Sequence, residues 1–296
     1  MRARIEQPDV RRRPQARKRF GQNFLEPAWA RKVIAAINPQ PGEAFLEIGP
    51  GPGAITRPLA ASAGSLVAVE VDRDLAAALQ DEQIPRVQVV QADFLKLGFD
   101  TLRDALVSSA PGATAYRVAG NLPYNVAAPI MFRLVDLSRR GLPLADATLM
   151  LQREVADRLL AKPGTGEYGL LTVLLGHRAS VDRVLNLPPG AFRPAPKVHS
   201  SVVRLRFHPP EPAVRDESVL AAVVGAVFSR RRKTLANALL AYSGQTPTRA
   251  ADALASAGID PIRRPETLSI AEFCRLSDAV DPGPAESTES VLPPVL

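Results

Sequence analysis

The chain has 296 residues, of which 46% are hydrophobic and 23% charged, so it is long enough for one large domain and a small one. Its net charge of +7 favours a polyanionic partner, nucleic acid or an anionic membrane surface, over a basic protein without one. A single cysteine, Cys274, excludes an internal disulfide, and the three histidines are scattered. No apolar run could span a bilayer and no secretory signal is present, so we expect a cytoplasmic protein without metal or membrane.

The chain begins with polar, basic residues, and 1–17 are therefore predicted to be a flexible arm. A helix is predicted over 29–37, and strands and helices then alternate. Strands are predicted at 44–49, 65–71, 87–93, 116–123 and 147–152, with helices at 54–63, 72–82, 102–109, 128–138, 154–161 and 168–178. Two late strands, 181–188 and 201–207, predict an antiparallel pair at the sheet edge. Alternation of this kind indicates an α/β, Rossmann-like sheet, mainly parallel, with helices on both faces.

The sequence changes character after residue 207. The proline-rich stretch 208–212 is typical of a stiff linker. Beyond it the pattern predicts only helices, at 216–242, 247–257 and 269–279. We therefore expect a catalytic domain over 18–207, a small α-helical domain over 208–280, and a disordered tail over 281–296, which is rich in proline, serine and glutamate.

A glycine-rich turn after the first strand predicts a nucleotide site. Gly49 and Gly51 let the backbone approach a ligand, and the helix that follows offers free N–H groups. Glu70 ends the next strand, where an acid accepts hydrogen bonds from a ribose diol unless it is only a solvated strand end. Asp93 ends the third strand, where it would meet an adenine edge or cap the next helix. This pattern leaves a nicotinamide dinucleotide, S-adenosylmethionine and a purely structural turn open.

The tetrapeptide Asn121-Leu122-Pro123-Tyr124 ends the fourth strand and is the most informative motif. Methylating an adenine amine requires acceptors for its protons, because its lone pair is delocalised into the ring. The Asn121 side chain and the Leu122 backbone each supply a carbonyl, and Pro123 constrains the turn. Tyr124 offers a flat face on which a flipped base stacks. An ordinary strand-to-helix turn is the alternative.

These motifs resemble the KsgA family of ribosomal RNA adenine dimethyltransferases over residues 17–280. The likeness is carried by blocks in the same order: RKRFGQNFL (17–25), EIGPGPGAIT (47–56), VEVDRDL (69–75), QADFL (91–95), GNLPYN (120–125), LQREVADRL (151–159), YGLLTV (168–173), FRPAPKVHSSVVRL (192–205) and FSRRRKTLANAL (228–239). The resemblance implies a class I methyltransferase fold that uses S-adenosylmethionine.

The resemblance also implies roles for individual residues. The QNFL segment would lie over the cofactor and line its methionine side, through Gln22, Asn23 and Leu25. The rest of the cofactor site would comprise Gly49, Gly51, Glu70, Asp93 and Asn121. Phe192 would approach the target base from the side opposite Tyr124, unless it is a buried core aromatic.

The family adds two methyl groups to N6 of each of two adjacent adenines near the 3′ end of 16S ribosomal RNA. It acts late in small-subunit assembly, on a pre-formed particle, and loss of its activity is associated with kasugamycin resistance. The resemblance therefore implies 16S ribosomal RNA within the small subunit as partner, and we expect a monomer.

Three other functions remain open. A sister group methylates an adenine of 23S ribosomal RNA and confers macrolide resistance, but GNLPYN, LQREVADRL and the long helical C-terminus favour the small-subunit enzymes. A non-catalytic RNA-binding assembly factor would not need Glu70, Asp93 and Asn121 intact. A nicotinamide oxidoreductase would not explain Asn121–Tyr124 or the basic clusters.

Phosphate contacts require clustered cations, and three clusters meet this requirement. They are Arg11–Arg13 with Arg17–Arg19, then Arg230, Arg231, Arg232 and Lys233, then Arg263 with Arg264. Within the predicted helix 216–242, the positions of the second cluster would fan around the helix, so only part of it could face RNA. A solvated helix face is the alternative; the resemblance and the net charge favour RNA contact by Arg230–Lys233.

Overall fold

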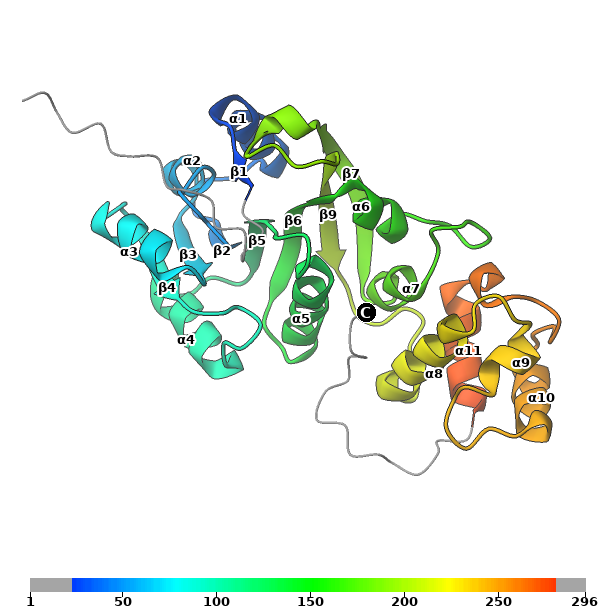
Figure 1. The fold of residues 1–296 in the computed structure, drawn as a ribbon. Coiled ribbons are helices and arrows are strands. Elements are labelled where there is room, and N and C mark those ends of the chain that lie inside the picture. Colours follow the sequence, from blue (N-terminus) through cyan, green and yellow to red (C-terminus); the bar gives the residue numbers. More distant parts are fainter. Residues whose placement is uncertain (1–22, 281–296) are drawn as a thin grey trace, which may run out of the picture.

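The computed structural model describes residues 23–280 of the chain (Figure 1). The arm predicted at 1–17, the tail predicted at 281–296 and Gln22 lie outside the described residues. No helix of the described part is long and apolar enough to cross a membrane.

A seven-stranded sheet with strand order β4-β3-β2-β5-β6-β9-β7 forms the centre of the fold. Strands β4, β3, β2, β5 and β6 run parallel, β9 runs antiparallel to β6, and β7 runs antiparallel to β9 at the edge. The strands are β2 (Ala44–Ile48), β3 (Ser65–Glu70), β4 (Val87–Gln91), β5 (Tyr116–Asn121), β6 (Leu144–Gln152), β7 (Ala179–Leu187) and β9 (Ser200–Phe207). The predicted α/β fold, with its late antiparallel pair, is confirmed.

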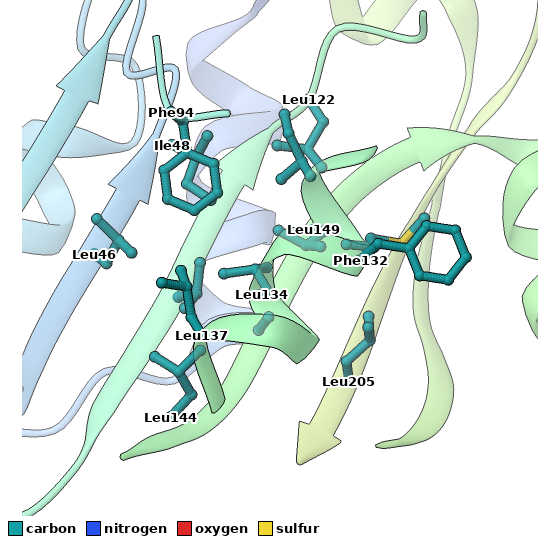
Figure 2. Close-up of a cluster of buried hydrophobic side chains, with 14 of the residues drawn as sticks. Leu46, Ile48, Phe94, Leu122, Phe132, Leu134, Leu137, Leu144, Leu149 and Leu205 are labelled. Carbon is teal, nitrogen blue, oxygen red and sulfur yellow. The ribbon is translucent and has the colours of Figure 1, made fainter. Parts of the chain in front are cut away.

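Helices cover both faces of the sheet, so strands such as β2 are buried along their whole length. One face packs against α4 (Phe99–Ser109), α5 (Ala127–Arg139), α6 (Arg153–Leu159) and α7 (Leu170–Gly176). The other packs against α1 (Pro27–Ile37) and α2 (Thr56–Ser62), while α3 (Arg73–Asp81) lies along β4. Figure 2 shows the first face, where Ile48, Phe94 and Leu122 pack at the end of the sheet that carries the cavity described below.

The C-terminal helices share a separate hydrophobic cluster. They are α8 (Glu217–Ser229), α9 (Leu235–Leu239), α10 (Pro247–Ser256) and α11 (Ile270–Ala279). The cluster also contains Tyr168 and Val173, which lie before the boundary expected at residue 207. The linker packs back on α7, since the His177 ring lies 2.7 Å from the Pro212 carbonyl oxygen. The two hydrophobic cores are therefore joined through the segment around α7.

The prediction of one helix over 216–242 is wrong. Helix α8 ends at Ser229, residues 230–233 form a turn, and α9 begins after Thr234. The first N–H groups of α9, those of Leu235 and Ala236, donate to the carbonyl oxygens of Arg263 and Pro261. The break is therefore stabilised by contacts with a loop distant in sequence, which helical periodicity does not report.

A two-stranded sheet, not predicted from the sequence, pairs β1 (Phe24–Leu25) with β8 (Phe192–Arg193). Phe24 is opposite Arg193, and Leu25 is opposite Phe192. Strands this short lack a usable alternation of polar and apolar residues. The pairing holds the segment 23–25 beside the carboxyl ends of the parallel strands.

Candidate active site

A cavity of about 320 Å3 lies at the carboxyl ends of β2, β3, β4 and β5. This rim is where ligands bind in open α/β sheets. The lining residues come from 23–25, 47–52, 54–55, 69–71, 92–95, 121–126, Ile130 and Met150. The structure thus brings together most of the predicted cofactor and target-base residues.

The glycine-rich turn adopts the backbone conformation that its composition predicts. Gly49, Gly51 and Gly53 have φ of +68°, +56° and +80°, in the region that side chains disfavour. A Cβ at Gly51 would lie 3.4 Å from the Phe24 ring, so the β1 segment closes over the turn. The turn and this segment together enclose one end of the cavity.

Glu70 is held by the backbone around it. Its Oε2 accepts the Gly51 N–H at 2.9 Å and its Oε1 accepts the Asp72 N–H at 2.9 Å. Only 4% of Glu70 is exposed, which excludes a solvated strand end, and burial raises its pKa. Each oxygen retains a second lone pair, which can accept a hydrogen bond from a ligand hydroxyl.

Asp93 lines the cavity and also caps a turn. Its Oδ1 accepts the Leu95 N–H at 3.0 Å, and its carbonyl oxygen accepts the N–H groups of Lys96 and Leu97. Helix α4 itself begins later, after Gly98. The cap holds the Asp93 carboxylate at the rim.

Asn121 is the last residue of β5, and a hydrogen bond fixes its side chain. Its Nδ2 donates to the Asn23 carbonyl oxygen at 2.8 Å. The amide is therefore oriented with its donor group toward the β1 segment, which leaves Oδ1 as the acceptor that this side chain can offer elsewhere. Asn23 and Asn121 are 98 residues apart in the sequence, so a long-range contact orients the side chain that is predicted to bind the target amine.

The next residues of the motif continue the cavity wall. Leu122 is buried at 1% exposure within the sheet–helix core, and its N–H lies 3.3 Å from the Met150 carbonyl oxygen. The Tyr124 hydroxyl lies 2.9 Å from Ser200 Oγ on β9, and burial raises the tyrosine pKa. Pro123 accepts the Val126 N–H, where α5 begins.

Phe192 is not among the residues that line the cavity. It is 2% exposed and belongs to the hydrophobic cluster that also contains Leu25 and Met150. Its strand pairs with the segment 23–25, so it supports the cavity wall from behind. The structure therefore places Phe192 in the core, the alternative considered for it.

Glu47 lines the cavity and was not singled out from the sequence. It is fully buried, and neither carboxyl oxygen has a hydrogen-bond partner among residues 23–280. Burial raises its pKa to about 8. The available signal was an acid inside the otherwise apolar strand AFLEI, a position where strands buried on both faces seldom carry charge.

The described residues that line the cavity include acidic side chains but no basic ones. Glu47, Glu70 and Asp93 contribute carboxyl groups, and no lysine, arginine or histidine lies among the described residues that form it. An anionic pyrophosphate would be repelled here, whereas a ligand with positive charge would be attracted. Among the described residues, this balance favours a cationic ligand over an anionic one.

The basic residues Arg230–Lys233 lie in the turn between α8 and α9 rather than within a helix. Arg230, Arg232 and Lys233 are exposed. Arg231 contacts other parts of the chain, because its guanidinium lies 3.2 Å from the Thr165 carbonyl oxygen and 3.8 Å from the Glu266 carboxylate. The turn thus offers three solvent-facing cations in the described chain.

The cluster expected at Arg263 and Arg264 is partly structural. Arg263 pairs with Glu272 and donates to the Thr267 carbonyl oxygen. This guanidinium lowers the pKa of Glu272 to about 2.

The cluster at 11–19 lies outside the described residues. No group of three potential ligands for a metal occurs among residues 23–280.

Comparison with known proteins places these features in a family. Residues 13–281 match the family described as ribosomal RNA adenine dimethylase. The chain is 45% identical over 268 residues to "Ribosomal RNA small subunit methyltransferase A" of Aromatoleum aromaticum, which covers 90% of this chain and 94% of the relative. A relative of the same name from Acinetobacter baylyi is 44% identical over 272 residues, covering 90% and 93%.

Solved structures show the same architecture. A dimethyladenosine transferase from Plasmodium falciparum matches with a TM-score of 0.68 and 25% identity, over 86% of this chain and 95% of its own. The 23S rRNA methyltransferase ErmE matches with a TM-score of 0.60 and 26% identity, over 88% of this chain and 100% of its own.

Proposed function

The chain belongs to the ribosomal RNA adenine dimethylase family, and from this premise we propose that it dimethylates N6 of two adjacent adenines near the 3′ end of 16S ribosomal RNA. The observation that carries the proposal is the cavity that Asn121 lines, whose described lining residues include three acids but no lysine, arginine or histidine. It combines a place for a cationic methyl donor with an oriented amide at the position where an amine would be methylated.

S-adenosylmethionine is the proposed donor, and its sulfonium supplies an activated methyl group when bound. Glu70 would accept hydrogen bonds from the ribose diol, and Asp93 would accept one from the adenine amine. Gly49 and Gly51 let the backbone approach the ligand. The methionine end would lie under Asn23 and Leu25, which line the cavity.

Catalysis would rest on positioning and polarisation. Asn121 Oδ1 and the Leu122 carbonyl oxygen would accept the two protons of the target amine, which directs its lone pair toward the methyl group. Tyr124 would stack on the flipped base, a contact worth roughly 1–3 kcal/mol. The N–CH3 bond would form as the S–CH3 bond of the donor breaks, with the electron pair of that bond left on a neutral thioether sulfur. The amine nitrogen would give up one proton to solvent, so that the product is a neutral methylated adenine.

The proposed substrate is 16S ribosomal RNA within the small subunit, a cytoplasmic particle, and the enzyme would act as a monomer. The exposed cations Arg230, Arg232 and Lys233 would contact phosphates, which fix register on an RNA without reading its sequence. The expected domains, with a catalytic unit over 18–207 and an RNA-binding unit over 208–280, belong to the same proposal.

A transfer assay tests the proposal. Labelled S-adenosylmethionine is incubated with the protein and small subunits that lack the modification, with 23S ribosomal RNA as parallel substrate. We expect dimethyladenine only in 16S RNA. Label in 23S RNA would instead indicate the sister activity, and label in neither would favour a non-catalytic assembly factor.

The Asn121→Ala variant should lose at least about 100-fold in the rate of transfer, since removing one preorganised polar contact to a reacting group costs roughly 2.7–4 kcal/mol. Asn186→Ala, on the edge strand and outside the cavity lining, is the matched control and should keep full activity. Equal activity of the two variants would contradict the role of Asn121.

A further inference from the structure

Glu47 is a buried acid whose charge nothing nearby compensates. Both of its carboxyl oxygens are shielded from solvent and lack a hydrogen-bond partner among residues 23–280. Burying a carboxylate in this way is costly, so a group in such a site normally takes up a proton. Glu47 lies in the wall of the ligand cavity, and a buried carboxyl group without a partner at such a place is a candidate functional residue.

The neighbouring strands do not neutralise Glu47, because β3 carries no basic residue and Arg117 on β5 is paired with Glu43 and Asp146. Its partners in register are Ala68 on β3 and Ala119 on β5, both fully buried, whose small side chains flank the carboxyl group. Further along β3, Glu70 carries a second carboxyl that disfavours charge on Glu47. These strands therefore add only repulsion.

Helix α2, on the remaining side, also fails to neutralise Glu47. The Thr56 hydroxyl favours the ionised form but is outweighed by burial. The Arg57 guanidinium is engaged elsewhere, since it donates to Glu82 at 2.6 and 2.8 Å and to the carbonyl oxygens of Pro52 and Gly53 at 2.8 and 2.9 Å. Besides Glu47 and Glu70, the acidic residue among the described residues that line the cavity is Asp93.

We propose that Glu47 carries a proton in the protein without donor and releases it when the cationic methyl donor binds, so that its carboxylate becomes the counter-charge of the ligand. The inference rests on the proposed function and names a further residue of the donor site. The O–H bond of the carboxyl group breaks, the electron pair stays on the oxygen, and the proton passes to the buffer. The ligand's positive charge replaces the proton as the neutralising charge.

The first test counts protons. Titration calorimetry of the full-length protein with S-adenosylmethionine at pH 6.5 is repeated in buffers of different ionisation enthalpy, and the dependence of the heat on that enthalpy gives the protons released per donor bound. We expect a release close to one proton for the wild type and close to zero for Glu47→Gln. Asp104→Asn, an exposed acid on α4, is the matched control and should match the wild type.

Two outcomes would overturn the assignment. One is the same proton count for the wild type and Glu47→Gln. The other is a count that disappears in Glu70→Gln but persists in Glu47→Gln, which would make Glu70 the source. A wild-type protein that binds no donor at all would instead refute the proposed function, so the two failures are distinguishable.

A second measurement needs no variant and covers the case in which Glu47→Gln does not fold. The dissociation constant of S-adenosylmethionine is determined for the wild type between pH 6 and 7, below the range where Glu47 would ionise by itself. One released proton predicts that the constant falls about tenfold for the unit rise in pH. A dissociation constant independent of pH would overturn the proposal.

Discussion

At the scale of single residues, the cavity depends on contacts between side chains far apart in sequence. Asn121 is oriented by the Asn23 carbonyl, and Gly51 is shielded by the Phe24 ring. Both contacts come from the segment 23–25, which contains the two-residue strand β1. We therefore expect this segment to orient the Asn121 amide as well as to cover the proposed ligand.

Gly51→Ala should weaken donor binding. The new Cβ would meet the Phe24 ring at 3.4 Å, and φ of +56° is unfavourable for alanine. We expect a loss of about 1 kcal/mol in donor binding, roughly fivefold in the dissociation constant by calorimetry. Gly112→Ala is the control, since φ there is +81° with no atom within 4 Å of the Cβ. A similar change of affinity in both variants would contradict the local explanation.

Glu47 should make the stability of the donor-free protein depend on pH. Its pKa rises from 4.5 in the unfolded chain to about 8, so between these values the folded protein holds a proton that the unfolded chain has lost. The free energy of unfolding therefore falls as pH rises through this window, by at most about 1.4 kcal/mol per pH unit. Thermal unfolding from pH 5 to 8 should show Glu47→Gln gaining stability relative to the wild type. Parallel profiles for the two proteins would refute this expectation.

At the scale of elements, the turn between α8 and α9 decides which cations face solvent. A continuous helix would have spread residues 230–233 around its axis. In the turn, Arg231 points back to Glu266 and Thr165, while Arg232 and Lys233 are exposed. Charge reversal at Arg231 would therefore test folding as much as RNA contact, and the exposed pair is the better target.

Arg232→Glu and Lys233→Glu should each weaken binding to small subunits while leaving donor affinity unchanged. Loss of one phosphate contact lowers the slope of log affinity against log salt by about 1. A filter-binding series in salt would measure this slope. Arg73→Glu, an exposed cation at the start of α3, changes the net charge equally and serves as control. The same slope for all three variants would leave only a general charge effect.

At the scale of the whole molecule, the two hydrophobic cores are joined through the segment that carries α7. Tyr168 and Val173 precede the expected domain boundary yet pack with α8 to α11. The linker adds hydrogen bonds from His208 and Glu211 N–H groups to the carbonyl oxygens of Arg178 and His177. The helical unit therefore packs directly against the segment around α7 of the larger one.

A chain that ends at residue 207 should be less stable than one that ends at 280. The cut exposes Tyr168 and Val173, which are 1% and 0% exposed in the intact fold. Each such side chain contributes roughly 1.5–3 kcal/mol by burial. Thermal unfolding of the two chains provides the test. Equal midpoints would show that the larger unit is self-sufficient.

The sequence by itself determined the class of fold, the family and the class of enzyme. Strand and helix periodicities, the glycine turn and the motif at 121–124 are local patterns, and local patterns are what a sequence displays directly. The predicted α/β fold and the predicted family and enzyme class are confirmed. The roles of individual site residues and the domain limits stay predictions.

Only the tertiary structure decided which residues meet. It placed Phe192 in the core, divided the helix expected over 216–242, and revealed that the Glu47 carboxyl group is buried. The physical reason is the same in each case. Burial, hydrogen-bond partners and the ends of helices depend on segments that are distant along the chain, and neither periodicity nor spacing carries that information.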